Sequence, residues 1–224
     1  HTETHEWPRK KAFFLAGIFL GLGAAARWVA LGIKPVIDLF LIKDFLKAER
    51  KRAYLSDIFF YLIILPIVVY FAVHLIFPFI EGFGWSEIWR DQLHMLRYHS
   101  DLKETHGYGS EWWSWPIMSR PIWYFFERKE GLVYGILCIG NPAVFWAIPL
   151  AMAYLFWDFL KRKTFLNAVI LTGFFIQWIP WAFVSRVKFF HYFYTVMPFA
   201  AMALALLIAK IWRAGTIGKW ITIS

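Results

Sequence analysis

The sequence predicts an all-α protein, a polytopic bundle of helices that crosses a membrane several times. Three observations support this fold class. Hydrophobic residues make up 60% of the 224-residue chain, whereas soluble domains contain about 45–50%. Several apolar runs reach the length of about 20 residues that a helix needs to cross a bilayer. The chain also contains 24 Phe and 14 Trp residues, and Trp is enriched where membrane proteins meet the interface.

Four segments have the length and apolar character of single spans, at 56–79, 131–157, 164–184 and 190–209. The region before them is interrupted by charged residues, so we expect one span over 12–32 and then a short returning or re-entrant helix that includes 36–42. We treat residues 1–224 as a single membrane domain. Because the chain begins with His1 rather than Met, we expect an N-terminally truncated fragment of a longer protein.

The net charge of +9 is better explained by membrane topology than by nucleic-acid binding. Basic residues cluster between the apolar segments, at 9–11, 43–52, 161–163 and 210–219. If every strong span crosses once, these clusters fall on the same side, which the positive-inside rule assigns to the cytoplasm. The loop at 80–130 is then external, on the non-cytoplasmic face.

The external loop should begin with an amphipathic helix that lies on the membrane surface. Ser86 is the expected N-cap, with Glu87 in the first turn to complement the helix dipole. Trp89, Leu93 and Leu96 share one helical face, as in an interfacial helix. The glycines of "HGYGS" then end the helix, and an aromatic loop follows. Further along, Asn141 and Pro142 suit the N-cap and first position of another helix.

The aromatic loop is the first candidate site. His106, Tyr108, Arg120 and Trp113 combine polar groups with large rings, which suits binding of a sugar, a phosphate or an acceptor peptide. The alternative is an aromatic belt that only holds the loop at the interface. Histidines are not required for such a belt, which favours the binding role. The histidine spacing does not predict a metal site, and Cys138 is the single cysteine.

Basic residues at the external end of the last two spans form the second candidate site. Arg186 and Lys188, close to His191, lie where the positive-inside rule disfavours basic residues. Arg offers a planar fork to phosphate oxygens and Lys a point charge, so we expect a phosphate site at headgroup level. The alternative is that they snorkel to the interface without further function. Arg27 follows a helix of small residues and either faces the same cavity or pairs with a structural carboxylate.

Four stretches of this chain resemble the protein O-mannosyltransferase family. They are "GLGAAARW", "HGYGSEWWSWPIMSRPIWYF", "GNPAVFW" and "SRVKFFHYFYTVMPF", in the order in which the family has them. The resemblance covers most of residues 17–199, and the loop motif together with the last pattern is its most specific part. Arg27 stands where the family commonly has Lys. The short loop at 80–130 has no room for the large soluble domain of fungal members, which favours a prokaryotic-type enzyme.

The resemblance implies a multi-spanning glycosyltransferase of the family C type, which would move mannose from polyprenyl phosphate mannose to Ser or Thr hydroxyls of exported proteins. It implies a prokaryotic plasma membrane, an active site on the external face, and no cofactor, metal or nucleic acid. Arg186, Lys188 and Arg27 would bind the donor phosphate, with His191 and Tyr192 in support. The loop of His106, Tyr108, Trp113 and Arg120 would bind donor or acceptor. The catalytic acidic pair is expected upstream of residue 1.

Three other functions fit parts of the sequence. A related transferase that acts on a lipid or polysaccharide would share the fold and the basic phosphate site. A transporter or flippase of lipid-linked intermediates would place ionisable residues near mid-bilayer and show inverted repeats. A noncatalytic membrane subunit would fit the absence of an acidic pair from residues 1–224.

Overall fold

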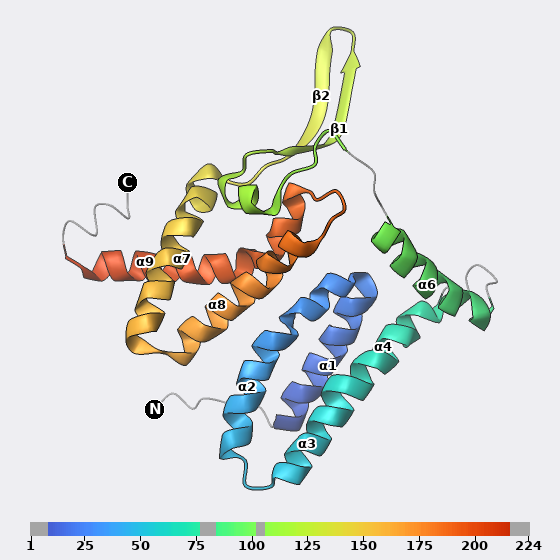
Figure 1. Ribbon diagram of the computed structural model, residues 1–224, viewed down its shortest axis with the longest axis vertical. Coiled ribbons are helices and arrows are strands. Elements are labelled where there is room, and N and C mark those ends of the chain that lie inside the picture. Colours follow the sequence, from blue (N-terminus) through green and yellow to red (C-terminus); the bar gives the residue numbers. More distant parts are fainter. Residues whose placement is uncertain (1–8, 77–83, 102–105, 216–224) are drawn as a thin grey trace. The chain divides into compact units, whose positions relative to one another are not determined.

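The computed structural model describes residues 9–76, 84–101 and 106–215. The chain forms two compact units, residues 1–99 and residues 100–224. Within the described residues, four helical segments are long and apolar enough to cross a membrane, which confirms the predicted fold class (Figure 1). They are Lys51–His74, Pro142–Arg162, Phe165–Phe183 and Phe190–Arg213.

The first unit begins with a helical hairpin. Helix α1 (Arg9–Ala26) is followed by the 3₁₀ helix η1 (Trp28–Ile33) and by helix α2 (Lys34–Lys47). The short helix expected around 36–42 is therefore confirmed and extends over Lys34–Lys47; its path relative to the membrane stays a prediction. The third segment is continuous: α3 (Lys51–Phe59), the π-helical turn η2 (Phe60–Ile64) and α4 (Leu65–His74) form one 24-residue span.

Small residues let α1 lie directly against the third segment. A Cβ atom on Gly17 would be 2.0 Å from the backbone carbonyl oxygen of Tyr61, and one on Gly21 would be 2.6 Å from the Cβ atom of Val69. Any larger residue at these two positions would force the helices apart, as expected where small residues bring membrane helices together. The core of this unit comprises Phe13, Leu20, Leu41, Tyr54 and Leu62.

Helix α6 (Trp85–Asp101) confirms the predicted helix at the start of the external loop. It begins two residues earlier than expected, at Trp85 rather than Glu87, so Ser86 lies inside the first turn rather than at the N-cap. The Glu87 carboxylate accepts the backbone N–H of Gly84, which is the return half of a capping box. The apolar residues Trp89 and Leu93 are more than half exposed. Their position on the membrane surface stays a prediction.

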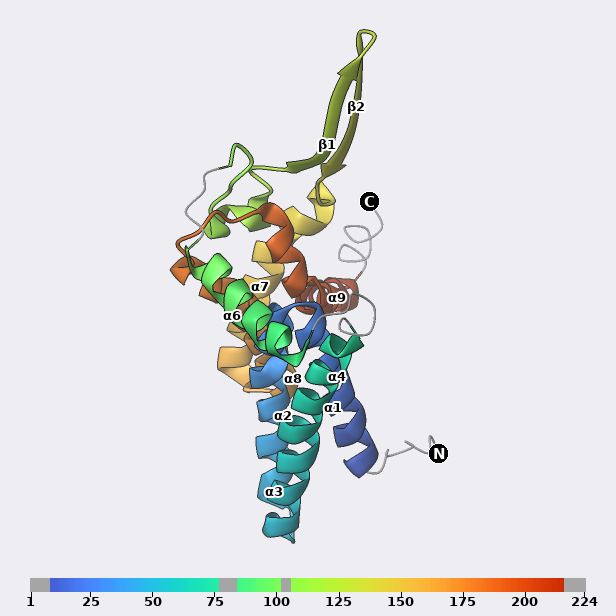
Figure 2. The same cartoon turned by 90° about the vertical axis from the view of Figure 1, so that its right-hand side faces the viewer.

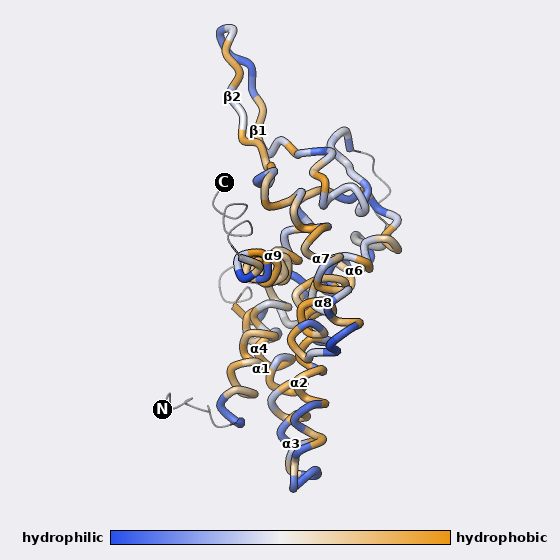
Figure 3. Tube along the Cα trace, turned by 90° about the vertical axis from the view of Figure 1, so that its left-hand side faces the viewer, coloured by the Kyte–Doolittle hydropathy of each residue, from blue (hydrophilic) through white to orange (hydrophobic). Residues whose placement is uncertain are grey.

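The second unit contains three of the apolar segments and a β-hairpin. Its elements are η3 (Trp112–Ile117), β1 (Ile122–Lys129), β2 (Leu132–Cys138), α7 (Pro142–Arg162), α8 (Phe165–Trp178), η4 (Ile179–Phe183), η5 (Phe190–Val196) and α9 (Met197–Arg213). Figure 2 shows the hairpin extending away from the helices of this unit. Most of the helical trace of α7, α8 and α9 is hydrophobic, with hydrophilic residues near the turns (Figure 3).

Capping residues set the helix boundaries in this unit. Asn141 is the N-cap of α7, and its side-chain oxygen accepts from the backbone N–H groups of Ala143 at 2.9 Å and Val144 at 3.4 Å. This confirms the predicted helix start. Lys163, with φ of 48°, ends α7 in the left-handed region, and Thr164 caps α8 through the N–H of Asn167. Consequently α7 and α8 are joined by a tight turn.

The predicted span at 131–157 is wrong at its beginning. Residues Leu132–Cys138 form strand β2, which pairs with β1 in an antiparallel register, and the helix begins only at Pro142. A short apolar run does not distinguish a strand from a buried helix by composition. Here residues 132–138 form a strand that pairs with the aromatic strand β1. The Trp123 ring of β1 covers Gly135 so closely that a Cβ atom there would lie 2.3 Å from it.

Candidate functional site

The loop after α6 folds back on itself in a tight turn. The backbone N–H of Gly109 donates to the carbonyl oxygen of His106 at 2.8 Å. The Nδ1 atom of His106 accepts from the N–H of Tyr108 at 3.2 Å. Arg120 donates from Nη1 to the carbonyl oxygen of Gly109 at 3.2 Å. These bonds hold the His106 and Tyr108 rings, whose centroids are 5.6 Å apart, on the exposed side of one turn.

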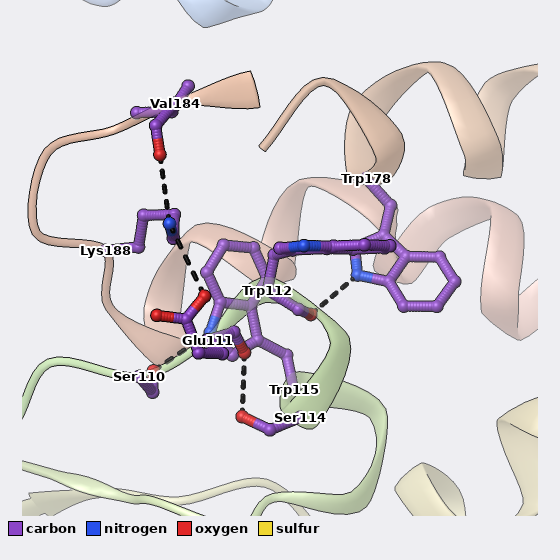
Figure 4. A network of polar contacts seen from close by, with 8 residues as sticks. All are labelled: Ser110, Glu111, Trp112, Ser114, Trp115, Trp178, Val184 and Lys188. Atoms are coloured by element: carbon purple, nitrogen blue, oxygen red, sulfur yellow. Dashed lines mark hydrogen bonds and ion pairs between the residues drawn. The ribbon is translucent and has the colours of Figure 1, made fainter. Parts of the chain in front are cut away.

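The turn is attached to the segment between η4 and η5 through Lys188. The backbone N–H of Ser110 donates to the carbonyl oxygen of Lys188 at 2.8 Å. The Lys188 side chain is only 10% exposed, and its Nζ atom lies 3.6 Å from Oε2 of Glu111. The same Nζ donates to the carbonyl oxygen of Val184 at 2.9 Å. Figure 4 shows Lys188 between these two acceptors, so its charge is already compensated within the protein.

Two tryptophans fix the aromatic loop to the helices below it. Trp115 is 1% exposed, and its indole N–H donates to Oγ of Ser110 at 2.9 Å. Trp178, at the end of α8, donates from Nε1 to the carbonyl oxygen of Trp112 at 2.9 Å (Figure 4). A buried indole needs such a partner, because an unpaired donor costs free energy. The two hydrogen bonds therefore hold the loop in one conformation against η5 and α8.

Arg186 lies beside a pair of stacked rings. The rings of Trp181 and Tyr192 are nearly parallel, with centroids 4.5 Å apart. The guanidinium carbon of Arg186 lies 5.8 Å from the centroid of the Tyr192 ring, within the range of a cation–π interaction. The stack therefore limits where the Arg186 guanidinium can lie. A planar, permanently charged fork is well suited to hold phosphate oxygens.

A row of rings connects this arginine region to the His106 turn. The ring of Phe189 packs edge-on against His106 with centroids 5.3 Å apart and stacks on His191 at 5.7 Å. His191 in turn contacts Tyr192 at 4.6 Å and Tyr124 of β1 at 5.8 Å. The loop turn, the basic segment and the base of the hairpin thus meet in one cluster.

The structure brings together six residues that the sequence singled out: His106, Tyr108, Arg186, Lys188, His191 and Tyr192. Arg120 supports the turn through its contact with Gly109. Trp113 is 60% exposed, and its part in binding stays a prediction. Arg27 belongs to the other unit. It is exposed and follows the last residue of α1, and its role in the donor site stays a prediction.

Sequence reasoning missed the residues that hold the cluster together. Glu111, Ser110, Trp181 and Phe189 each contact a predicted site residue but were not named as candidates. Glu111 and Ser110 lie inside the loop motif, so their position in that motif could have marked them as candidates. Within the described residues, no group of three or more His, Cys, Asp or Glu side chains could hold a metal ion.

The comparisons with known proteins place this cluster in a defined family region. Residues 84–221 match the model of the C-terminal four-transmembrane region of protein O-mannosyltransferases. The chain belongs to the protein O-mannosyltransferase family. The matched region contains the entire cluster around Arg186 and the His106 turn, together with three of the apolar spans.

Curated relatives agree with this family membership. The chain is 27% identical over 136 residues to a polyprenol-phosphate-mannose–protein mannosyltransferase of Mycobacterium tuberculosis. This match covers 55% of this chain and 26% of the relative. It is 27% identical over 143 residues to the protein of that name in Corynebacterium glutamicum, a match that covers 59% of this chain and 27% of the relative. It is 24% identical over 136 residues to the protein of that name in Mycolicibacterium smegmatis, a match that covers 55% of this chain and 26% of the relative. The chain thus spans about a quarter of these relatives. No solved structure matches it.

Proposed function

We propose that this protein is a glycosyltransferase that moves mannose from a polyprenyl phosphate mannose donor to Ser or Thr hydroxyls of exported proteins. The observation that carries the proposal is the cluster around Arg186, which lies inside the matched family region. Curated relatives of the chain are named for the same donor and for protein acceptors. A related transferase with a lipid or polysaccharide acceptor would use the same donor site, and the experiment below separates the two.

The reaction requires a group that stabilises the leaving phosphate. The acceptor oxygen forms a bond to the anomeric carbon while the bond from that carbon to the phosphate oxygen breaks. The bonding electrons leave with polyprenyl phosphate, and the acceptor proton passes to a base. Arg186, positioned by the Trp181–Tyr192 stack, is our candidate to stabilise the growing negative charge. Preorganised charges of this kind are a major source of enzymatic rate enhancement.

We propose that Lys188 acts mainly through its contacts within the protein. Because its Nζ is buried between Glu111 and Val184, we assign it to holding the His106 turn over Arg186, with a contribution to the local positive potential. Glu111 is engaged in the same pair, so we do not assign it as the general base. His106 and Tyr108, exposed on the turn, remain our candidates for contacts with donor or acceptor.

The orientation in the membrane follows from charge. The basic ends of α7 and α9, at Lys161–Arg162 and at Lys210 and Arg213, should face the cytoplasm of a prokaryotic cell by the positive-inside rule. One candidate span separates each of these ends from the Arg186 cluster, and this supports a position of the cluster on the external face. Arg27 would contribute to the donor site only if it reaches this same face.

The test is mannosyl transfer in membranes that contain the complete protein. Radiolabelled polyprenyl phosphate mannose and a Ser/Thr-rich peptide are supplied, and label on the peptide is counted. Arg186→Gln should lower transfer by about 100-fold or more, as for other lost transition-state contacts. Arg128→Gln, which removes the same charge from an exposed position of β1, should leave transfer unchanged. Label on a lipid or glycan instead of the peptide would show that the acceptor is not a protein. Unchanged transfer by the Arg186→Gln variant would refute the phosphate role.

A further inference from the structure

A polar cavity lies at the opposite end of the first unit's helices from the junction of α1 and η1. Its volume is about 450 Å³, and it is lined by Arg9, Lys10, Glu49, Arg50, Ala53 and Asp57. These residues come from the first turn of α1, the connection between α2 and α3, and the first two turns of α3. Figure 3 shows that the chain is hydrophilic where α1 and α3 begin and hydrophobic further along both helices.

A buried carboxylate orients the basic residues of this cavity. The Asp57 side chain is 12% exposed, and its Oδ2 accepts from Nη2 of Arg9 at 2.7 Å. Its Oδ1 lies 4.0 Å from Nζ of Lys10. The Arg9 guanidinium carbon also lies 5.1 Å from the centroid of the Tyr54 ring. Asp57 and Tyr54 therefore keep Arg9 at the cavity wall, whereas an unrestrained surface arginine would sample many conformations.

The balance of charge favours an anion with one negative charge. Arg9, Lys10 and Arg50 bring three positive charges to the lining, and Glu49 and Asp57 bring two negative charges. The start of α3 adds to the positive potential, because within the described residues no side chain caps it and its first turn contains no acidic residue. The exposed amides of such a helix end attract anions.

The position of the cavity along the span indicates a lipid rather than a soluble ligand. The span Lys51–His74 begins at the cavity, so the cavity lies at headgroup depth, at the basic end that we expect on the cytoplasmic side. Further along the same span, Phe59 and Phe60 are about half exposed, at the depth of the acyl chains. Basic pockets between membrane helices on the cytoplasmic side are known to hold anionic headgroups.

We propose that this cavity binds the phosphodiester headgroup of an anionic phospholipid, with Arg50 and Lys10 contacting the phosphate and Asp57 positioning the Arg9 and Lys10 side chains. This site is separate from the Arg186 cluster and does not depend on the proposed transferase function. It would give the first unit a specific lipid contact at the cytoplasmic surface, in addition to the general attraction of basic residues for anionic membranes.

The experiment compares two variants that remove the same charge from neighbouring positions. Arg50 lines the cavity, whereas Arg52 is exposed in the first turn of α3 and does not line it. Binding of phosphatidylglycerol and of phosphatidylcholine to the purified protein in detergent is measured by native mass spectrometry. We expect phosphatidylglycerol to bind more tightly. Arg50→Gln should weaken its binding about tenfold, as expected for a lost charge-assisted contact, and Arg52→Gln by less than about twofold.

Three results would overturn the proposal. Equal weakening by Arg50→Gln and Arg52→Gln would show diffuse attraction to a basic surface. Equal binding of the two lipids would exclude a charge-selective site. Competition by glycerophosphoglycerol, the same headgroup without chains, at the affinity of the lipid would show a soluble-phosphate site. If Arg50→Gln does not fold, Lys10→Gln is compared with Lys11→Gln, because Lys10 lines the cavity and Lys11 does not; only Lys10→Gln should weaken binding, by about fivefold.

Discussion

Removing the Ser110 hydroxyl should loosen the whole aromatic loop. Oγ of Ser110 accepts the indole N–H of Trp115 at 2.9 Å, and Trp115 is 1% exposed. The variant Ser110→Ala therefore leaves a buried donor without its partner, which costs about 1–3 kcal/mol. Ser114→Ala is a matched control four residues away. Oγ of Ser114 donates to the carbonyl oxygen of Glu111 at 2.7 Å, but that oxygen also accepts the backbone N–H of Ser114. Its loss should cost less than about 1 kcal/mol.

Hydrogen exchange measured by mass spectrometry on peptides from 106–121 reports this difference. A cost of 1–3 kcal/mol corresponds to about 5- to 150-fold faster exchange in Ser110→Ala. Exchange in Ser114→Ala should accelerate by less than about fivefold. Peptides from α7 should keep their exchange rates in both variants, because the change is local. Equal acceleration in the two variants, or no acceleration in Ser110→Ala, would refute the conclusion that the Trp115–Ser110 bond fixes the loop.

Two further predictions concern the helices that carry the site. Gly173→Ala should destabilise the packing of α8 on α9 by about 1–3 kcal/mol, because the new Cβ atom would lie 2.1 Å from the ring of the buried Phe199. Gly107→Ala is the control, because nothing lies within 4 Å of a Cβ atom at that position. Both variants are unfolded by titration with a denaturing detergent, and Gly107→Ala should keep the stability of the wild type. Asn141→Ala should lower stability in the same titration by about 0.5–2 kcal/mol through loss of the α7 cap, whereas Asn141→Ser should restore most of it; equal losses would exclude the capping role.

The membrane spans and the helix caps were predictable because they depend on local sequence. Length and apolarity identify a span without knowledge of its neighbours. The Asn141-Pro142 pair marks a helix start by itself, as an N-cap followed by a proline at the first helical position. The position of α2 was also accessible, since Pro35 near its beginning and the apolar residues after it define a short helix. The family motifs added the expectation that the aromatic loop and the Arg186 region act together.

The β-hairpin and the surroundings of Lys188 depend on contacts between distant residues, so local patterns did not reveal them. Strand β2 is an apolar run whose pairing partner lies in a stretch that composition assigned to the loop. Lys188 has the charge of a phosphate ligand, yet the fold buries its Nζ against Glu111, which precedes it by more than seventy residues. Arg27 follows an apolar stretch of small residues, and the chain exposes it directly after the end of α1.

The central claim is that Arg186 holds the phosphate of a polyprenyl-linked sugar, and direct donor binding tests it without requiring catalysis. Polyprenyl phosphate mannose would be titrated against the wild-type protein and the Arg186→Gln and Arg128→Gln variants in nanodiscs. A lost charge-assisted contact predicts about tenfold weaker binding for Arg186→Gln and unchanged binding for Arg128→Gln. If Arg186→Gln binds the donor as tightly as the wild type, or if both variants lose affinity equally, the phosphate site lies elsewhere and the account is contradicted.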